Sequence, residues 1–249
     1  MIRRLLVLAS LALGTSALLA GPALATHSWS NYHWARTANP FTLKVVDSNT
    51  ADWDDNQAGA ISDWSRSTVM DLTREAGDDS SRARKRCVMI SGKIHSCNAA
   101  YGTNGWLGLA SINISGGHIT QGSAKMNDSY FSSPSYNETA RQHVMCQEIG
   151  HDFGLTHQDE SGADLNTCMD YASALDNPSP NQHDYDQLQT IYQHLDSTTT
   201  INAAGAMPDA VPSWAPATQR SQSVYVDRLA DGSELVTFVL WANPIHGWR

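Results

Sequence analysis

Hydrophobic and polar positions recur along the first part of the chain in a pattern typical of both strands and helices. Residues 41–46 alternate and end in a polar turn, which predicts a strand. Tryptophan, alanine and isoleucine then recur at helical spacing, which predicts an amphipathic helix over 51–65. A second strand is predicted over 68–73. The pattern therefore gives strand, helix and strand in that order.

The middle of the chain has a weaker pattern. Residues 74–103 are charged and contain glycine, which predicts an irregular segment. The basic run at 82–86 is either a patch for an anionic partner or a solvated loop, and runs of this kind are more often solvated loops. Strands are predicted at 106–114 and 119–126, joined by a Gly-Gly hairpin turn.

A further helix is predicted to begin near Asn137, a favourable N-cap residue, and to lead into residues 147–157, which read QEIGHDFGLTH. In that helix Gln147 and His151 lie one turn apart on the same face, with Glu148 beside them. This is the spacing of the helical metal motif in zinc proteases.

Gly154 can turn the chain at the end of this helix so that a later residue completes a metal site. It permits positive φ, so the helix can stop and His157 can return toward His151. Two imidazoles and a carboxylate are the parts of a catalytic zinc site, with nitrogen ligands for Zn²⁺ and Glu148 as a base for its bound water. A helix that contains two histidines usually does not bind a metal. The joint occurrence of these residues with Met169 carries the prediction.

The stretch 147–157 resembles the metzincin signature HExxHxxGxxH, with Gln147 in place of the first histidine. Downstream, residues 168–171 (CMDY) resemble the Met-turn that metzincins place beneath the zinc. Residues 181–192 look like the closing helix of matrixin catalytic domains. The resemblance covers about residues 34–195.

The resemblance implies an α+β fold with a metzincin-like twisted mixed sheet, an active-site helix, a Met-turn and a C-terminal helix. It also assigns roles to five residues, with His151, His157 and Gln147 as metal ligands, Glu148 as general base and Tyr171 as a donor to the oxyanion. Met169 and Gly154 would support the site structurally. By the same resemblance, the strand at 119–126 would be the sheet edge on which substrate pairs.

Gln147 leaves the third metal ligand open, because a neutral amide is a weaker donor than imidazole. Its side-chain oxygen is one option and Tyr171 is another. Asp159 is close enough in sequence to ligate, although it fits better as a group that orients a neighbour. Glu148 itself could complete a set of two histidines and a carboxylate, which suits iron as well as zinc.

Four cysteines allow three pairings. We expect Cys87 to pair with Cys97, closing a local loop, and Cys146 with Cys168, tying the metal helix to the Met-turn. Alternatively, both disulfides would only stabilise an exported fold, without a role in the metal site. His95 and His118 resemble ligands of the second, structural zinc of some matrixins, but the remaining ligand pattern of that site is not visible in the sequence.

Residues 1–25 have the basic start, apolar centre and small-residue cleavage site of a secretory signal peptide. No later stretch is apolar enough to span a bilayer, so we expect a secreted protein with no membrane contact after cleavage. Without Arg3 and Arg4 the 16 basic residues fall to 14, against 25 acidic ones. That balance disfavours nucleic acid as a partner.

The domains expected are therefore the signal peptide at 1–25, a metzincin-like catalytic domain at 26–197, and a linker with a β-hairpin at 198–249. The hairpin strands at 224–229 and 235–241 flank an Asp-Gly turn. A lone hairpin is marginal in water, so it must dock on the main domain or meet a partner.

Two functions of different classes fit these observations. The first is a secreted zinc-dependent endopeptidase that acts as a monomer on peptide or protein substrates, with Glu148 as general base. The second is a non-catalytic secreted binding protein that keeps a metzincin fold and a weakened metal site, because of Gln147.

Overall fold

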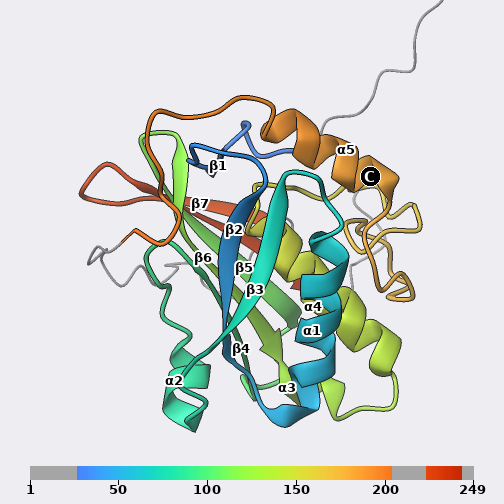
Figure 1. The fold of residues 1–249 in the computed structure, drawn as a ribbon. Coiled ribbons are helices and arrows are strands. Elements are labelled where there is room, and N and C mark those ends of the chain that lie inside the picture. The colour runs from blue at the N-terminus through green and yellow to red at the C-terminus, as the bar shows by residue number, and fades with distance from the viewer. Residues whose placement is uncertain (1–26, 204–222, 243–249) are drawn as a thin grey trace, which may run out of the picture.

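One mixed β-sheet forms the centre of the molecule (Figure 1). The computed structural model describes residues 27–203 and 223–242. In space the strands follow the order β3-β2-β4-β6-β5-β8-β7, and β1 also pairs with β6. The strands are β1 (His33–Trp34), β2 (Phe41–Ser48), β3 (Met70–Ala76), β4 (Ile94–Ala99), β5 (Trp106–Ser115), β6 (His118–Asn127), β7 (Val224–Arg228) and β8 (Glu234–Trp241). The expected α+β class is confirmed.

The sheet order corrects one prediction. β1, β2, β3, β4 and β6 pair in parallel, whereas β5, β8 and β7 pair antiparallel with their neighbours. The strand predicted at 119–126 is β6, and it lies inside the sheet between β4 and β5. The prediction that it forms the substrate edge is wrong, because the β5–β6 hairpin places β5 on the outer side, an order that residue alternation does not encode.

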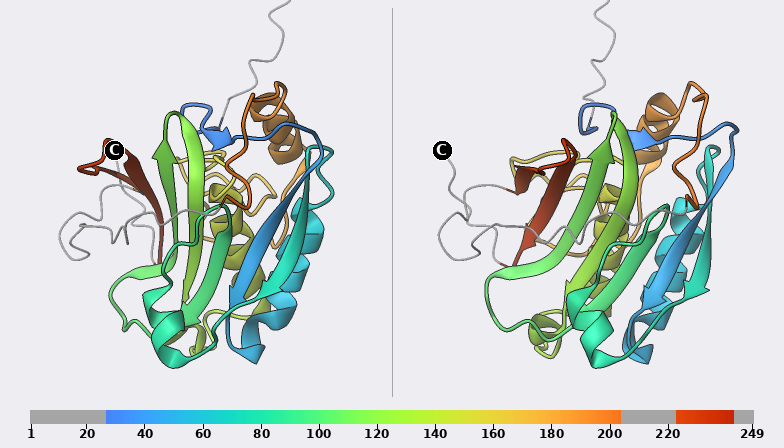
Figure 2. Two further views of the ribbon diagram at one scale, coloured as in Figure 1. Left: turned by 60° about the vertical axis from the view of Figure 1, so that its left-hand side comes forward. Right: turned by 90° about the vertical axis from the view of Figure 1, so that its left-hand side faces the viewer.

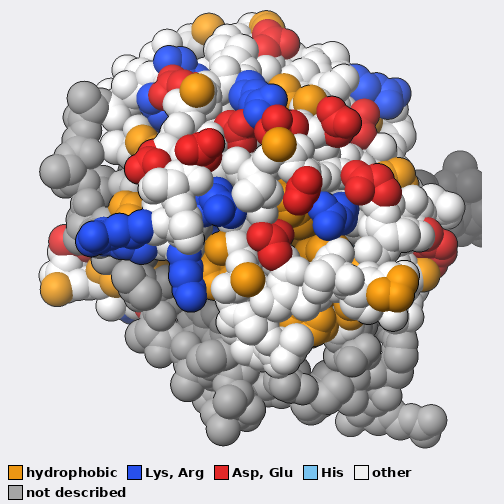
Figure 3. Space-filling view, turned by 90° about the horizontal axis from the view of Figure 1, so that it is seen from below, with side chains coloured by type: hydrophobic (Ala, Val, Ile, Leu, Met, Phe, Trp, Pro, Cys, Tyr) orange, Lys and Arg blue, Asp and Glu red, His pale blue; other side chains and the backbone are white. Residues whose placement is uncertain are grey.

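The segment 74–103 is also more regular than predicted. It holds α2 (Ser81–Arg86) and β4, whose six residues are all buried. β4 gave no alternating signal because polar side chains fill its buried positions and are satisfied there; Asn98, for example, donates to Asp128 at 2.7 Å. The basic run 82–86 lies on α2 near the lower face of the molecule, where acidic and basic side chains are interspersed (Figure 3).

Two helices pack side by side on one face of the sheet (Figure 2). They are α1 (Asp54–Trp64), which follows the 3₁₀ turn η1 (Ala51–Trp53), and α4 (Glu138–His151). Trp64 Nε1 donates to the Cys146 carbonyl at 3.0 Å, which joins the two helices through a buried hydrogen bond. α4 begins where predicted, because the Asn137 side chain accepts from the Ala140 backbone N–H. The remaining helices are α3 (Asp128–Phe131) and α5 (Gln182–Ile191).

The C-terminal hairpin docks on the main domain through β5. β8 runs antiparallel to β5 from the Ile114–Glu234 pair to the Trp106–Trp241 pair. Its side chains alternate, so that Phe238 joins the core beneath α4 while Val239 packs with Trp106 on the opposite face. Of the two outcomes expected for the hairpin, the structure shows docking on the main domain.

Both expected disulfides are formed, Cys87–Cys97 and Cys146–Cys168. The predicted signal peptide and residues 204–222 of the predicted linker lie outside the described residues. Within the described ranges, every helix is too short or too polar to cross a bilayer.

Candidate metal centre

The end of α4 and the bend after it bring His151 and His157 together. Gly154 has φ of +93°, and a Cβ there would lie 2.1 Å from the Tyr32 carbonyl oxygen, so the turn requires glycine. The chain then doubles back, and Nε2 of His151 lies 3.2 Å from Nε2 of His157. The structure thus places the two predicted imidazoles edge to edge.

The other nitrogen of each ring is already hydrogen-bonded. His151 Nδ1 lies 2.9 Å from the Leu155 carbonyl, which can only accept, so Nδ1 carries the proton. His157 Nδ1 donates to the Glu160 carboxylate at 2.7 Å. Burial, followed by the neighbouring His157, lowers the pKa of His151 well below its ordinary value, so that ring is neutral. Its Nε2 lone pair therefore needs a cation, or a proton on His157, in front of it.

Gln147 adds an oxygen donor one turn earlier on α4. Its Nε2 donates to the Asp170 carbonyl at 2.7 Å. Its Oε1 is buried, with no hydrogen-bond partner among the described residues. A buried polar atom left unpaired costs stability, so a cation in front of Oε1 would remove a penalty. Two imidazole nitrogens and an amide oxygen fit Zn²⁺, which accepts nitrogen and oxygen ligands.

Glu148 follows Gln147 on α4 and is fully buried. Neither of its carboxylate oxygens has a hydrogen-bond partner among the described residues, and burial, followed by Asp152, raises its pKa well above the usual range. Gly108 on β5 faces it, because a Cβ at Gly108 would lie 2.2 Å from Glu148 Oε1. In the described ranges, groups of three or more His, Cys, Asp or Glu side chains with ligand atoms within 4.8 Å of one another do not include Glu148. The alternative that made Glu148 a metal ligand together with the two histidines is therefore not supported.

The segment 168–171 packs against the last turns of α4. Met169 is fully buried, and a Cβ at Gly150 would lie 2.5 Å from its sulfur, so a glycine on the helix makes room for it. The Tyr171 ring centroid lies 4.5 Å from that of His157. The Tyr171 hydroxyl is 3.5 Å from the Val239 carbonyl of β8, and burial raises the pKa of this tyrosine.

Two neighbours of the histidines were not predicted from the sequence. Glu160 orients His157, and its spacing of three residues from that histidine was a signal that could have been used. Asp159, considered as a ligand, instead accepts from the Ser161 backbone N–H at 2.6 Å. Phe238 of β8 stacks on His151 with ring centroids 4.3 Å apart and an interplanar angle of 4°. Nothing in the sequence distinguishes Phe238 from other apolar strand residues.

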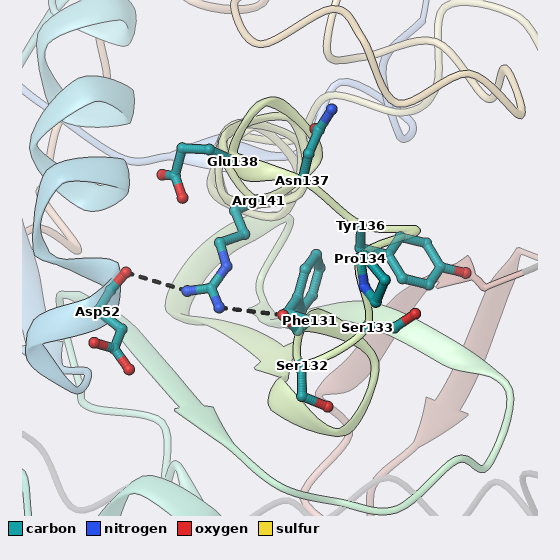
Figure 4. A pocket seen from close by; sticks show the side chains of 9 residues that line it. All are labelled: Asp52, Phe131, Ser132, Ser133, Pro134, Tyr136, Asn137, Glu138 and Arg141. Carbon is teal, nitrogen blue, oxygen red and sulfur yellow. Dashed lines mark hydrogen bonds between the residues drawn. The ribbon is translucent and has the colours of Figure 1, made fainter.

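These side chains are closed to solvent. Exposure is 0% for Gln147 and Glu148, 1% for His151 and 4% for His157. The hollow drawn in Figure 4 lies elsewhere, at the N-terminal end of α4, where Arg141 donates to backbone carbonyls. It is about 15 Å along the helix from His151 and includes none of the residues of the metal centre.

No protein-family model and no curated protein matches the chain. Among solved structures, the chain is similar to high choriolytic enzyme 1, a hatching enzyme zinc-protease from Oryzias latipes (medaka fish). The TM-score is 0.38 and the identity 10%, over 66% of this chain and 96% of that chain. Likeness at this level carries no argument about function, which must be argued from the site itself.

Proposed function

We propose that the chain is a secreted zinc-dependent endopeptidase of metzincin type, in which Gln147, His151 and His157 hold Zn²⁺. The observation that carries this proposal is the pair of facing Nε2 atoms, each on a ring whose Nδ1 is already bonded to a protein oxygen. When bound, Zn²⁺ would supply a Lewis acid for the scissile carbonyl and lower the pKa of a water molecule.

The chain's own residues would then carry the proton transfers. Glu148 would take a proton from the attacking water and pass it to the leaving amine. A nearby cation favours the ionised form of a carboxyl group, which offsets the effect of burial and lets Glu148 act as a base first. Tyr171 would donate to the developing oxyanion. Leu155 and Glu160 would keep both imidazoles oriented.

The substrate class that fits is an extended peptide or unfolded protein. β5 brings Gly108 against Glu148, so a substrate strand that took the place of β8 along β5 would pass next to the general base. Two disulfides suit an oxidising compartment, which supports secretion. We expect the mature chain to act as a monomer, without nucleic acid or membrane partners.

The test uses the full mature chain. Zinc content is measured by elemental analysis, and cleavage of an unstructured polypeptide is followed with and without a chelator. We expect chelation to stop cleavage and zinc to restore it, whereas Glu148→Ala retains zinc and does not cleave. A zinc-loaded chain that cleaves no unstructured substrate and behaves like Glu148→Ala would end the proposal.

A second function is a secreted binding protein that keeps the metal centre without using it. Gln147 and the stacking of Phe238 on His151 favour it. Gln147→His separates the two functions. Activity that appears only in this variant would identify the natural chain as a binder, while a loss of activity would show that Gln147 belongs to a working site.

A further inference from the structure

Three histidines and an aspartate meet at one end of the sheet, far from α4 in sequence. His33 lies on β1 and His118 at the start of β6, where they are register partners. His194 and Asp196 follow α5. Three segments of the chain, separated by more than seventy positions each, thus converge on one point.

The donor atoms of this cluster have the spacing of metal ligands. His118 Nε2 lies 3.2 Å from Asp196 Oδ1 and His33 Nε2 lies 3.4 Å from Asp196 Oδ2. His194 Nε2 lies 3.2 Å from His33 Nε2 and 3.6 Å from Asp196 Oδ1. Ligands on a tetrahedral zinc with bonds of about 2.0 Å stand about 3.3 Å apart. The His118 and His194 rings both meet His33 nearly at right angles, at 87° and 89°, so their edges converge on it.

The hydrogen bonds of the His33 ring also favour a cation at this cluster. Its Nδ1 lies 2.8 Å from the Asn31 carbonyl and must donate to it. In the neutral ring, Nε2 then presents a lone pair to a carboxylate and to a second imidazole nitrogen, which is repulsive unless a cation or an added proton lies between them. Arg36 binds Asp196 Oδ2 at 2.9 Å, which leaves Oδ1 directed to His118 and His194.

We propose that His33, His118, His194 and Asp196 form a second metal site that binds zinc in a structural role. Ligand atoms of His33, His118 and Asp196 lie within 4.8 Å of one another, and His194 Nε2, 3.2 Å from that of His33, would be the fourth ligand, the number found in closed structural zinc sites. The side chains of His118 and His194 are 31% and 51% exposed, so an ion can reach the site from solvent. Bound there, the metal would fasten β1 and the segment after α5 to the start of β6.

The test is metal content in the full mature chain with His118→Gln/His194→Gln. Both positions are open to solvent, so the variant is expected to fold, and circular dichroism checks this. Gln193→Ala, an exposed neighbour, is the matched control. We expect the double variant to hold one zinc fewer per chain than wild type and the control, and to show a smaller rise in unfolding temperature on addition of zinc than either.

Two results would overturn this site. One is a double variant that binds as much zinc as the control. The other is a wild-type chain whose whole zinc content disappears in His151→Ala, because the cluster would then be held by protons alone. Failure of the peptidase proposal has a different signature, since it leaves the zinc difference between the double variant and the control in place.

A second inference rests on β8 and also on the proposed function. β8 fills the strand position along β5 that an extended substrate would need. Phe238 covers His151, and the Val239 carbonyl faces the Tyr171 hydroxyl at 3.5 Å, where a substrate carbonyl would accept. We infer that β8 is a built-in occupant of the substrate groove, and that the hairpin must leave β5 before a peptide can bind.

An engineered disulfide between positions 111 and 237 tests this inference by locking β8 onto β5. Ser111 and Thr237 are partners across the two strands, and their hydroxyl oxygens are 3.0 Å apart. The oxidised double variant Ser111→Cys/Thr237→Cys fixes β8 in place, and the two single variants are its matched controls. Phe238→Ala loosens β8. We expect the locked chain to lose cleavage and the loosened chain to cleave faster than wild type.

A zinc-binding peptide hydroxamate gives a second measurement that needs no turnover. The loosened chain should bind it at least tenfold more tightly than the locked chain. Equal binding by the locked, single-cysteine and loosened chains would overturn the role of β8. If the loosened chain binds the hydroxamate but no form cleaves, the peptidase proposal fails and the occlusion by β8 stands.

Discussion

The two histidine clusters have similar nitrogen-to-nitrogen spacings but are built in opposite ways. In the α4 cluster, His151 and His157 come from one turn and bend of the chain and are nearly inaccessible to solvent, and Phe238 stacks on His151. In the second cluster, His33 meets His118 and His194 from distant segments, and two of the three rings are open to solvent.

The donor sets differ as well. The α4 cluster has two facing imidazoles, and the same helix carries the unpaired Gln147 amide oxygen and the unpaired Glu148 carboxylate. In the proposed second site, His194 would be a fourth protein donor beside His33, His118 and Asp196, which would leave no open position. In our proposals, the incomplete set of ligands belongs to the reactive site and the complete set to the structural one.

The largest expected effect is on catalysis at the α4 cluster. Glu148→Ala should lower the rate of peptide cleavage by roughly 10²–10⁴-fold, the usual contribution of a general base, while zinc content stays the same. Steady-state kinetics and elemental analysis of the same preparations measure both. A fall of similar size in His118→Gln would break the comparison, because the two clusters would then not be independent.

Next in size is the effect of metal on stability. Free zinc at about a thousand times its dissociation constant stabilises a folded chain by about 4 kcal/mol. Urea unfolding with and without a chelator should show an effect of this order for each occupied site, and His118→Gln/His194→Gln should lose the part that the second cluster contributes. If the double variant keeps the full difference, the stabilising metal is at the α4 cluster and the assignment of roles is reversed.

Gly154→Ala should cost about 1–3 kcal/mol, the range for a residue forced into a sparsely populated backbone conformation. The added Cβ would also press on the Tyr32 carbonyl oxygen. Urea unfolding measures the loss, and zinc at the second cluster should be retained. A variant as stable as wild type would show that the bend at His157 tolerates other residues.

The smallest expected effect is that of Tyr171→Phe. The Tyr171 hydroxyl is a weak donor at 3.5 Å to β8 and is one of several stabilisers of a developing charge, so its loss should reduce kcat about tenfold, or 1.4 kcal/mol. KM should change little. An unchanged kcat would remove Tyr171 from the chemistry and leave it as packing against His157.

The sequence predicted the α4 cluster because its parts are local. Helical spacing from Gln147 to His151 and a glycine bend to His157 can be read from eleven consecutive residues. The second cluster could not be predicted in this way, since His33 and His118 meet only through the register of β1 on β6. Long-range strand pairing depends on the whole fold and not on local alternation.

The dependence on the whole fold also explains why β4 and the docking of β8 were not predicted. β4 is buried on both faces with polar side chains, so it shows neither alternation nor an apolar run. The docking of β8 on β5 decides which residues cover His151, and a hairpin signal contains no information about its partner strand. Cys146 and Cys168 were predicted to pair because the resemblance, not the spacing, placed them together.

The docking of β8 on β5 also matters during synthesis, because β8 is translated long after β5. β5 is complete when about half of the chain has been synthesised, yet its outer edge stays unpaired until β8 follows, more than a hundred residues later. An exposed strand edge invites pairing with other chains. Until translation of β8 is finished, the nascent protein is therefore open to misassembly through this edge.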